Sequence, residues 1–345
     1  GLWTLRYLDG SLHYAYSSNE NSWETDQVSA HSKTGSVFQY FFDTFGRQAI
    51  DGNGSTIISV VNVTSDGQPM DNAYWNGAYM AYGDGDILFT PLAGALDIGA
   101  HEISHGIVER TVNLEYKFQS GALNESFADI FGAMVDRDDW QMGENVVNTE
   151  YYPSGALRDL SNPNQLGQSY NGWQPAHMDE FIDAEITWDN GGVHYNSGIP
   201  NKACYLIADE IGREKTEQIY YKVLEAEYLN SQATFIDMRL AAILAVTEFV
   251  DEDILGFVNS DITAVTNAFD AVGIVGDEGS EAPEDSDPVQ GEDWIAVVNN
   301  EDGDHSLLMI DPEDESVVNT ITNTQVFTGT GNPITINGVG TRILF

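Results

Sequence analysis

Residues 101–105 read HEISH, and residues 121–132 read GALNESFADIFG. Apolar residues recur through both stretches at helical spacing, so each is predicted to form a helix. Four residues of a helix turn the chain by about 400°, which puts His101 and His105 within about 40° of each other on one face. That spacing lets both imidazoles bind one zinc ion, with Glu102 beside them. Taken alone, the pentapeptide also fits an amphipathic surface helix with two solvated histidines.

A third ligand separates these interpretations, because a catalytic zinc keeps three protein ligands and one open position. Glu125, twenty residues after His105, supplies a carboxylate on the second predicted helix. Asp129 follows at i+4 on the same face, where it can accept the spare N–H of a ligating histidine and fix its tautomer. Each acidic residue taken singly fits a solvated helix face, but the two together favour a metal site.

These blocks resemble the signature of the thermolysin-like neutral zinc metalloproteases (gluzincins), and the resemblance extends over residues 25–274. Three further blocks match it: residues 72–77 (NAYWNG), 82–86 (YGDGD) and 189–198 (DNGGVHYNSG). The resemblance implies a zinc-dependent endopeptidase that cuts internal peptide bonds with a metal-bound water. It assigns the zinc to His101, His105 and Glu125, and the role of general base to Glu102.

Other matching positions imply how the substrate and the reacting oxygen are held. Asn72 and the Ala73 carbonyl would bind the substrate backbone as an added strand. Arg158, in LRDLSNP, would grip the substrate carbonyl on the leaving-group side. Taken separately, this arginine also fits a surface ion pair.

The same resemblance assigns the stabilisation of the oxyanion. His194 would donate to it, oriented by Asp189, and Tyr116, eleven residues after His105, would assist. Asn124 and Asp129 are expected to orient the zinc ligands. A histidine in a glycine-rich loop and a tyrosine of the core are the alternatives for His194 and Tyr116.

Apolar residues occupy the family positions of the pocket on the leaving-group side, which predicts cleavage before bulky hydrophobic residues. The six positions are Phe89, Leu92, Ile98, Met142, Val146 and Leu157. Ordinary core packing is the alternative for some of them.

A structural calcium ion is a second expected cofactor, because hard cations bind oxygen ligands. Carboxylates resembling the family's calcium ligands are Asp97, Asp136, Asp139 and Glu144. The segment between Asp136 and Asp139 is shorter than in the family, and Gln141 stands where a glutamate is usual. One calcium is therefore expected rather than a close pair.

The chain is strongly acidic, with 13 Lys+Arg against 55 Asp+Glu and a formal net charge of −42. Such a surface repels nucleic acid, whose binding needs lysine and arginine at the phosphates. It suits a marine or halophilic bacterial source, because salt screens the self-repulsion. We expect a secreted monomer that acts on peptides and proteins and has no membrane span. The one cysteine, Cys204, is expected in the core.

The order of the patterns predicts an α+β protein with a zinc cleft between two lobes. A mostly β lobe with one embedded helix, residues 27–45, covers residues 1–95, although residues 1–25 do not match the family. A mainly helical lobe covers residues 96–274. An acidic, glycine- and proline-rich linker follows at 275–293. Residues 294–345 are predicted as a truncated β module resembling one propeller blade.

Three other functions compete with an endopeptidase. A related aminopeptidase would carry a Gly-x-Met-Glu-Asn motif, and the chain has none. An inactive zinc-binding module is disfavoured by the presence of Glu102, Tyr116 and His194. An adhesive role fits the tail. Because the chain starts at Gly1 and ends in an apparent strand, a processed product or a fragment is expected.

Overall fold

The computed structural model describes residues 1–15 and 23–276 in full, together with the backbone of five short strands after residue 294. The chain divides into two compact units, Gly1–Gly276 and Asp277–Phe345, and each is considered by itself. The predicted linker, residues 275–293, lies outside the described residues from 277 on.

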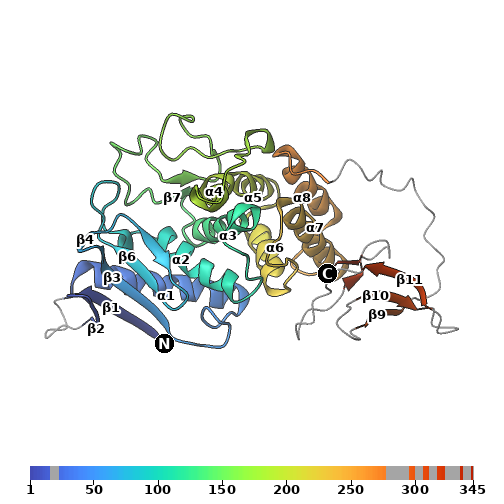
Figure 1. Cartoon of the computed structure of the whole chain (residues 1–345), viewed down its shortest axis with the longest axis horizontal. Coiled ribbons are helices and arrows are strands. Elements are labelled where there is room, and N and C mark those ends of the chain that lie inside the picture. Colours follow the sequence, from blue (N-terminus) through green and yellow to red (C-terminus); the bar gives the residue numbers. More distant parts are fainter. Residues whose placement is uncertain are drawn as a thin grey trace. The chain divides into compact units, whose positions relative to one another are not determined.

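A mixed sheet of six strands forms the first part of the larger unit (Figure 1). The strand order is β2-β1-β3-β6-β5, and β4 pairs with the end of β3. β1, β3 and β6 run parallel, whereas β2 and β5 are antiparallel edges. Their bounds are β1 Leu2–Leu8, β2 Ser11–Tyr14, β3 Ile57–Ser65, β4 Gln68–Pro69, β5 Ala73–Trp75 and β6 Met80–Gly83. Residues 1–15, where the sequence alone showed no resemblance to the family, thus contribute β1 and β2 to this sheet.

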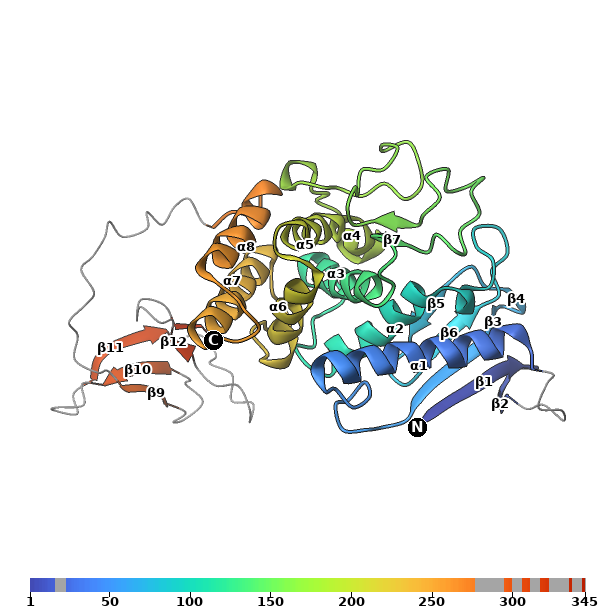
Figure 2. The ribbon, with the colours of Figure 1, turned by 180° about the vertical axis from the view of Figure 1, so that it is seen from behind.

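The first helix, α1 (Thr25–Phe45), lies along one face of the sheet, as the view from behind shows (Figure 2). It buries Val37 and Phe41 on that face. It ends at Gly46, whose φ of 72° is left-handed and whose N–H caps the carbonyls of the last turn. The predicted helix 27–45 is thus confirmed, with two more residues at its start.

Two adjacent helices connect the sheet to the helical part of the unit. They are α2 (Leu96–Glu109), after a 3-10 turn η1 at Leu92–Gly94, and α3 (Phe118–Val135). Every residue of α3 from Ser120 to Met134 is buried. A helix that is buried all round is the centre of a core, which explains why its sequence shows so weak a polar face.

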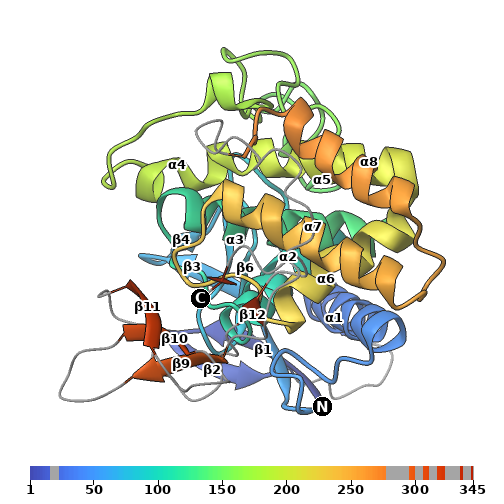
Figure 3. The ribbon, with the colours of Figure 1, turned by 90° about the vertical axis from the view of Figure 1, so that its right-hand side faces the viewer.

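Five more helices complete the described part of the larger unit: the first four pack against α3, and the last packs against the second and fourth of them (Figure 3). Their bounds are α4 Asp189–Asn196, α5 Gly198–Ile211, α6 Arg213–Glu225, α7 Phe235–Asp251 and α8 Asn259–Ala271. The long loops before α4 carry β7 (Gln141–Met142), β8 (Arg158–Asp159) and the 3-10 turn η2 (Met178–Glu180). Cys204 of α5 is fully buried, as expected.

Among its described residues, the smaller unit has one three-stranded antiparallel sheet, ordered β11-β10-β9, and one pair, β12-β13. The strands are β9 Ile295–Asn299, β10 Ser306–Ile310, β11 Val317–Thr322, β12 Thr335–Ile336 and β13 Ile343–Leu344. The expected fold class is confirmed: a β-rich part with an embedded helix precedes a mainly helical part. The resemblance of the tail to a propeller blade stays a prediction.

Candidate active site

Three side chains from α2 and α3 converge on one point. His101 Nε2 lies 3.0 Å from His105 Nε2, and Glu125 Oε2 and Oε1 lie 3.6 and 3.4 Å from these two nitrogens. A tetrahedral zinc with bonds of about 2.0–2.1 Å requires ligand atoms about 3.3 Å apart. These atoms are the only such group among the residues that the structure describes. The donor set therefore fits a zinc ion.

A buried carboxylate fixes the first of these histidines. Asp129 Oδ1 lies 2.9 Å from His101 Nδ1, so Nε2 is left to face the metal position. The same carboxylate accepts two charge-assisted bonds from Arg158, Nε at 2.8 Å and Nη2 at 2.7 Å, and one from Asn201 Nδ2 at 2.9 Å. The arginine predicted to grip the substrate is thus engaged with Asp129, although it also lines the cleft.

Asn124 fixes the second histidine. Its Oδ1 lies 2.7 Å from His105 Nδ1, and its Nδ2 donates to the carbonyl of Leu114 at 3.3 Å. Because that carbonyl can only accept, the amide oxygen must face the imidazole. His105 therefore carries its proton on Nδ1 and presents Nε2 to the metal position.

Charges in this cluster shift the protonation of its members. Burial by itself would raise the pKa of Glu125, but His194 and His105 hold it well below its usual range. Burial would lower the pKa of His105, but Glu125 opposes this and raises it to about 9. Without a metal, the cluster is thus an anionic carboxylate facing imidazolium, and a divalent cation would replace the proton.

Glu102 lies between the two histidines in sequence and lines the same cleft. It is 5% exposed, and its Oε2 has no protein partner within the described part of the chain. A buried carboxylate oxygen of this kind is placed to accept a proton from a molecule in the cleft.

Tyr116 and His194 line the cleft next to Glu125. Tyr116 O–H contacts Glu125 Oε1 and lies 3.0 Å from His194 Nε2, which is itself 3.4 Å from Glu125 Oε1. Burial, reinforced by Glu125, raises the pKa of Tyr116, so its phenol stays protonated. Glu125 and the hydrogen bond to Asp189 raise the pKa of His194. A raised pKa favours the protonated imidazole, in which Nε2 as well as Nδ1 is a donor, so both Tyr116 and His194 can donate hydrogen bonds into the cleft.

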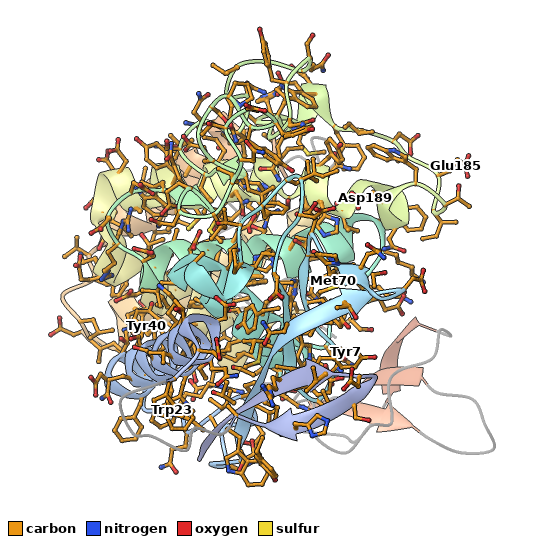
Figure 4. The ribbon with its side chains drawn as sticks, turned by 90° about the vertical axis from the view of Figure 1, so that its left-hand side faces the viewer. Tyr7, Trp23, Tyr40, Met70, Glu185 and Asp189 are labelled. Atoms are coloured by element: carbon orange, nitrogen blue, oxygen red, sulfur yellow. The ribbon has the colours of Figure 1, made fainter. Side chains whose placement is uncertain are left out.

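The position of His194 depends on an unusual backbone. Residues 189–192 all have positive φ, between 47° and 89°, which makes a left-handed turn before the regular part of α4. Gly191 is required there, because a Cβ would lie 2.3 Å from the ring of Phe118. The turn folds Asp189 back onto His194, with Oδ1 at 2.5 Å from Nδ1 and Oδ2 accepting from the backbone N–H at 2.9 Å. In Figure 4, Asp189 lies above Met70, on the side of the view away from Tyr40 of α1.

The cleft around these groups has the edge strand β5 on one side. Asn72, Ala73, Tyr74 and Trp75 all line it, and Trp75 Nε1 donates to Glu109 at 2.7 Å, which ties β5 to the end of α2. Among the strands that the structure describes, β5 pairs only with β6, so its other edge can accept a peptide strand.

Four of the six predicted pocket residues line the cleft: Phe89, Leu92, Ile98 and Leu157. The other two do not reach it. Met142 is fully buried against Gly132 of α3, and Val146 is 3% exposed against Gly94. Met142 of β7 packs against α3, and Val146, in the turn that follows, packs against η1, so both side chains face the core.

Sequence reasoning missed a loop wall of the cleft. Its residues are Gln168, Ser169, Tyr170, Asn171, Gly172, Trp173 and Gln174, and the single tyrosines Tyr152 and Tyr195 join them. The only local signal in the sequence is the mixture of aromatic residues and glycine at 170–173. A loop's sequence does not show which other part of the chain the loop will pack against.

The predicted calcium carboxylates lie near one another without forming a compact ligand group. Burial, with Asp136 adding to it, raises the pKa of Asp97 to about 6, and burial with Asp97 raises that of Glu144 to about 7. Asp97 Oδ2 accepts from the N–H of Gly143, while Asp97 Oδ1 and Glu144 Oε2 are buried without a protein partner in the described residues.

Comparison with known proteins agrees with this fold and site. Residues 5–109 match the family model for the thermolysin metallopeptidase catalytic domain, and residues 112–274 match that for its alpha-helical domain. The expectation that residues 1–25 depart from the family is therefore wrong from residue 5 on. The chain belongs to the thermolysin metallopeptidase family, whose members contain a catalytic zinc.

Individual relatives agree with the family models. The chain is 41% identical to neutral protease NprE of Bacillus pumilus, over 72% of this chain and 76% of that protein. It is 42% identical to an extracellular elastase of Staphylococcus epidermidis, over 76% of this chain and 50% of that protein. The structure of the precursor of protealysin, a metalloproteinase from Serratia proteamaculans, superposes with a TM-score of 0.68 at 29% identity, covering 80% of this chain and 88% of that one.

The chain spans about half the length of the first curated relatives that it matches. No helix among the described residues is long and apolar enough to cross a membrane.

Proposed function

We propose that this chain is a secreted zinc endopeptidase that hydrolyses internal peptide bonds before bulky hydrophobic residues. The observation that carries the proposal is the convergence of His101, His105 and Glu125 at zinc-ligand spacing beside the free carboxylate of Glu102. Secretion is supported by relatives such as the extracellular elastase. We also propose a monomer.

Each residue then has one role. When bound, zinc supplies a Lewis acid that polarises the scissile carbonyl and acidifies a water molecule. Glu102 accepts the proton of the attacking water and returns it to the leaving amine. Tyr116 and His194 donate hydrogen bonds to the carbonyl oxygen as its negative charge develops.

The substrate is held on both sides of the reacting bond. Asn72 and Ala73 bind its backbone along the free edge of β5. The residue after the cut enters the apolar pocket made by Leu92, Ile98 and Leu157, and Arg158 approaches the carbonyl that follows it.

A calcium ion bound by Asp97, Asp136, Asp139 and Glu144 completes the proposal. It is supported by the two buried oxygens without protein partners, because unpaired buried carboxylates are costly unless a cation neutralises them.

Casein hydrolysis tests the enzyme. The wild type should cleave casein, and a chelator should abolish the cleavage. Glu102→Gln should lose activity by at least about 100-fold with one zinc per chain retained. Full activity in Glu102→Gln, or wild-type protein that binds zinc and cleaves nothing, would contradict the proposal. A peptide series that is cut preferentially before charged residues would contradict the specificity alone.

A further inference from the structure

The loop wall of the cleft belongs to a compact loop whose two ends are hydrogen-bonded to each other. Residues 163–174 leave and rejoin the fold at one place, because the N–H of Gln174 donates to the carbonyl of Pro163 at 2.8 Å. Asn164 Nδ2 donates to the carbonyl of Gln174 at 3.1 Å, and Gln165 Nε2 to that of Gly172 at 2.8 Å. This is a compact Ω-loop, and its base is Gln174.

The side chain of Gln174 points from this base to the backbone of α4. It is 3% exposed, and its Nε2 donates to the carbonyl of His194 at 2.6 Å and to Ser197 Oγ at 3.0 Å. The carbonyl can only accept, so the amide nitrogen must face it. A Cβ on Gly198, at the start of α5, would lie 2.6 Å from Gln174 Cβ, so the side chain has little room to move.

His194 is therefore held at three points. Asp189 binds its backbone N–H and its ring Nδ1, and Gln174 binds its carbonyl. That carbonyl lies at the break between α4 and α5, where Ser197 interrupts the helix. Without Gln174, the carbonyl of His194 keeps the longer side-chain contact with Ser197 Oγ at 3.3 Å, so the residue is fixed mainly on its Asp189 side and the ring can pivot about that contact away from Tyr116.

We propose that Gln174 is a positioning residue that holds His194 where its Nε2 meets the developing oxyanion. The inference rests on the proposed endopeptidase function, in which His194 donates to that oxygen. Because Gln174 is also the last residue of the loop wall, it links that wall to His194.

The first test replaces the amide by a side chain of similar length without a donor. Gln174→Met should lower kcat for an internally quenched peptide by about 10- to 100-fold, since a displacement of about 1 Å costs this much. KM should stay within about twofold, and zinc content should be unchanged. Affinity for a phosphinic peptide, whose tetrahedral group mimics the transition state, should fall in parallel with kcat/KM. The matched control is Gln27→Met, which removes an equally buried amide from α1, away from the cleft.

A double-mutant cycle decides whether Gln174 acts through His194. In a His194→Ala background, Gln174→Met should have no further effect on kcat. Full additivity of the two losses would overturn the proposal. So would a Gln174→Met enzyme that matches Gln27→Met in both kcat and thermal stability.

A measurement independent of activity separates this inference from the proposed function. In crystal structures of the zinc-loaded wild type and Gln174→Met, the distance from His194 Nε2 to Tyr116 O–H should increase from 3.0 Å in the variant. An unmoved ring overturns the positioning role even if the enzyme is active. A wild type without peptidase activity removes the proposed function, while the ring displacement still decides the role of Gln174.

Discussion

Asp129 connects His101 of α2, Arg158 and Asn201 of α5 through one carboxylate. One buried carboxylate accepts from His101, Arg158 and Asn201, and burial, which would raise its pKa, is outweighed by Arg158 and His101, so its pKa is lowered. A lowered pKa means that its contribution to stability is present above the unfolded value, near 3.8, and is lost as the pH falls through the folded value.

Asp129→Asn should damage both stability and zinc binding. An amide cannot neutralise Arg158, and leaving a buried charge unpaired costs about 3–5 kcal/mol. Loss of the orienting carboxylate should weaken zinc binding by about 10- to 100-fold. Urea unfolding and competition with a chromogenic chelator measure the two effects. Asp43→Asn, an exposed site on α1, is the control of equal charge and should change neither.

Zinc binding should release protons from the cluster at neutral pH. The pKa of His105 is raised to about 9 by Glu125 against the effect of burial. Its ion pair with Glu125 thus stabilises the metal-free protein fully below about pH 6.5 and is lost as the pH rises through about 9. Calorimetric titration with zinc at pH 7, in buffers of different ionisation enthalpy, should show release of about one proton or more per zinc. Equal heats in all buffers would contradict this.

At the level of elements, the left-handed turn before α4 is the feature that no helical pattern could reveal. Residues 189–198 were recognised by resemblance, but the four successive positive φ values at 189–192 and the close packing of Gly191 on Phe118 are visible only in the structure. Periodicity did locate α1, α2, α3 and the buried strand β3, because their apolar spacing is a local property. It could not locate the parallel pairing of β1 with β3 or the loop wall at 168–174, since both depend on contacts between distant parts of the chain.

In the candidate site, too, some residues could be predicted from local spacing and others could not. The ligands and their orienting carboxylate sit at fixed helical intervals, so their convergence could be predicted from two helices. Met142 and Val146 could not be separated from the apolar residues that line the cleft, because the sequence pattern of an apolar side chain is the same whether it faces a cleft or the core.

Gly191→Ala should displace the turn and with it His194. A methyl group would lie 2.3 Å from Phe118 Cδ1 at a φ of 89°, so strain of about 1–3 kcal/mol adds to a steric clash. We expect kcat to fall by more than about tenfold together with a lower Tm. Gly46→Ala is the matched control, with a φ of 72° and nothing within 4 Å of the added methyl. It should lose only about 1–2 kcal/mol of stability and no activity.

Calcium should reduce the pH dependence of stability that arises from the carboxyl groups of Asp97 and Glu144. Their pKa values, about 6 and about 7, are raised by burial, with added repulsion from Asp136 on Asp97 and from Asp97 on Glu144, so the folded state binds more protons than the unfolded state. Stability of the calcium-free, zinc-loaded protein should therefore fall as the pH rises from about 4 to about 8. Added calcium should remove most of this fall in Tm, and magnesium should not. An identical pH profile with and without calcium would exclude a site there.

For the whole molecule, the net charge of −42 on 345 residues destabilises the folded state through repulsion between carboxylates, which no single ion pair offsets. Sodium chloride shortens the screening length from about 10 Å at 0.1 M to about 3 Å at 1 M, which weakens repulsion between carboxylates more than it weakens buried pairs such as Arg158 with Asp129. The Tm should rise with salt, by about 2–4 °C for each kcal/mol recovered. Sucrose of equal osmolarity is the uncharged control and should do less. The gain should also shrink as the pH approaches the pI of about 4.1, where the repulsion itself disappears. A Tm that is independent of salt at neutral pH would show that the acidic surface does not limit stability.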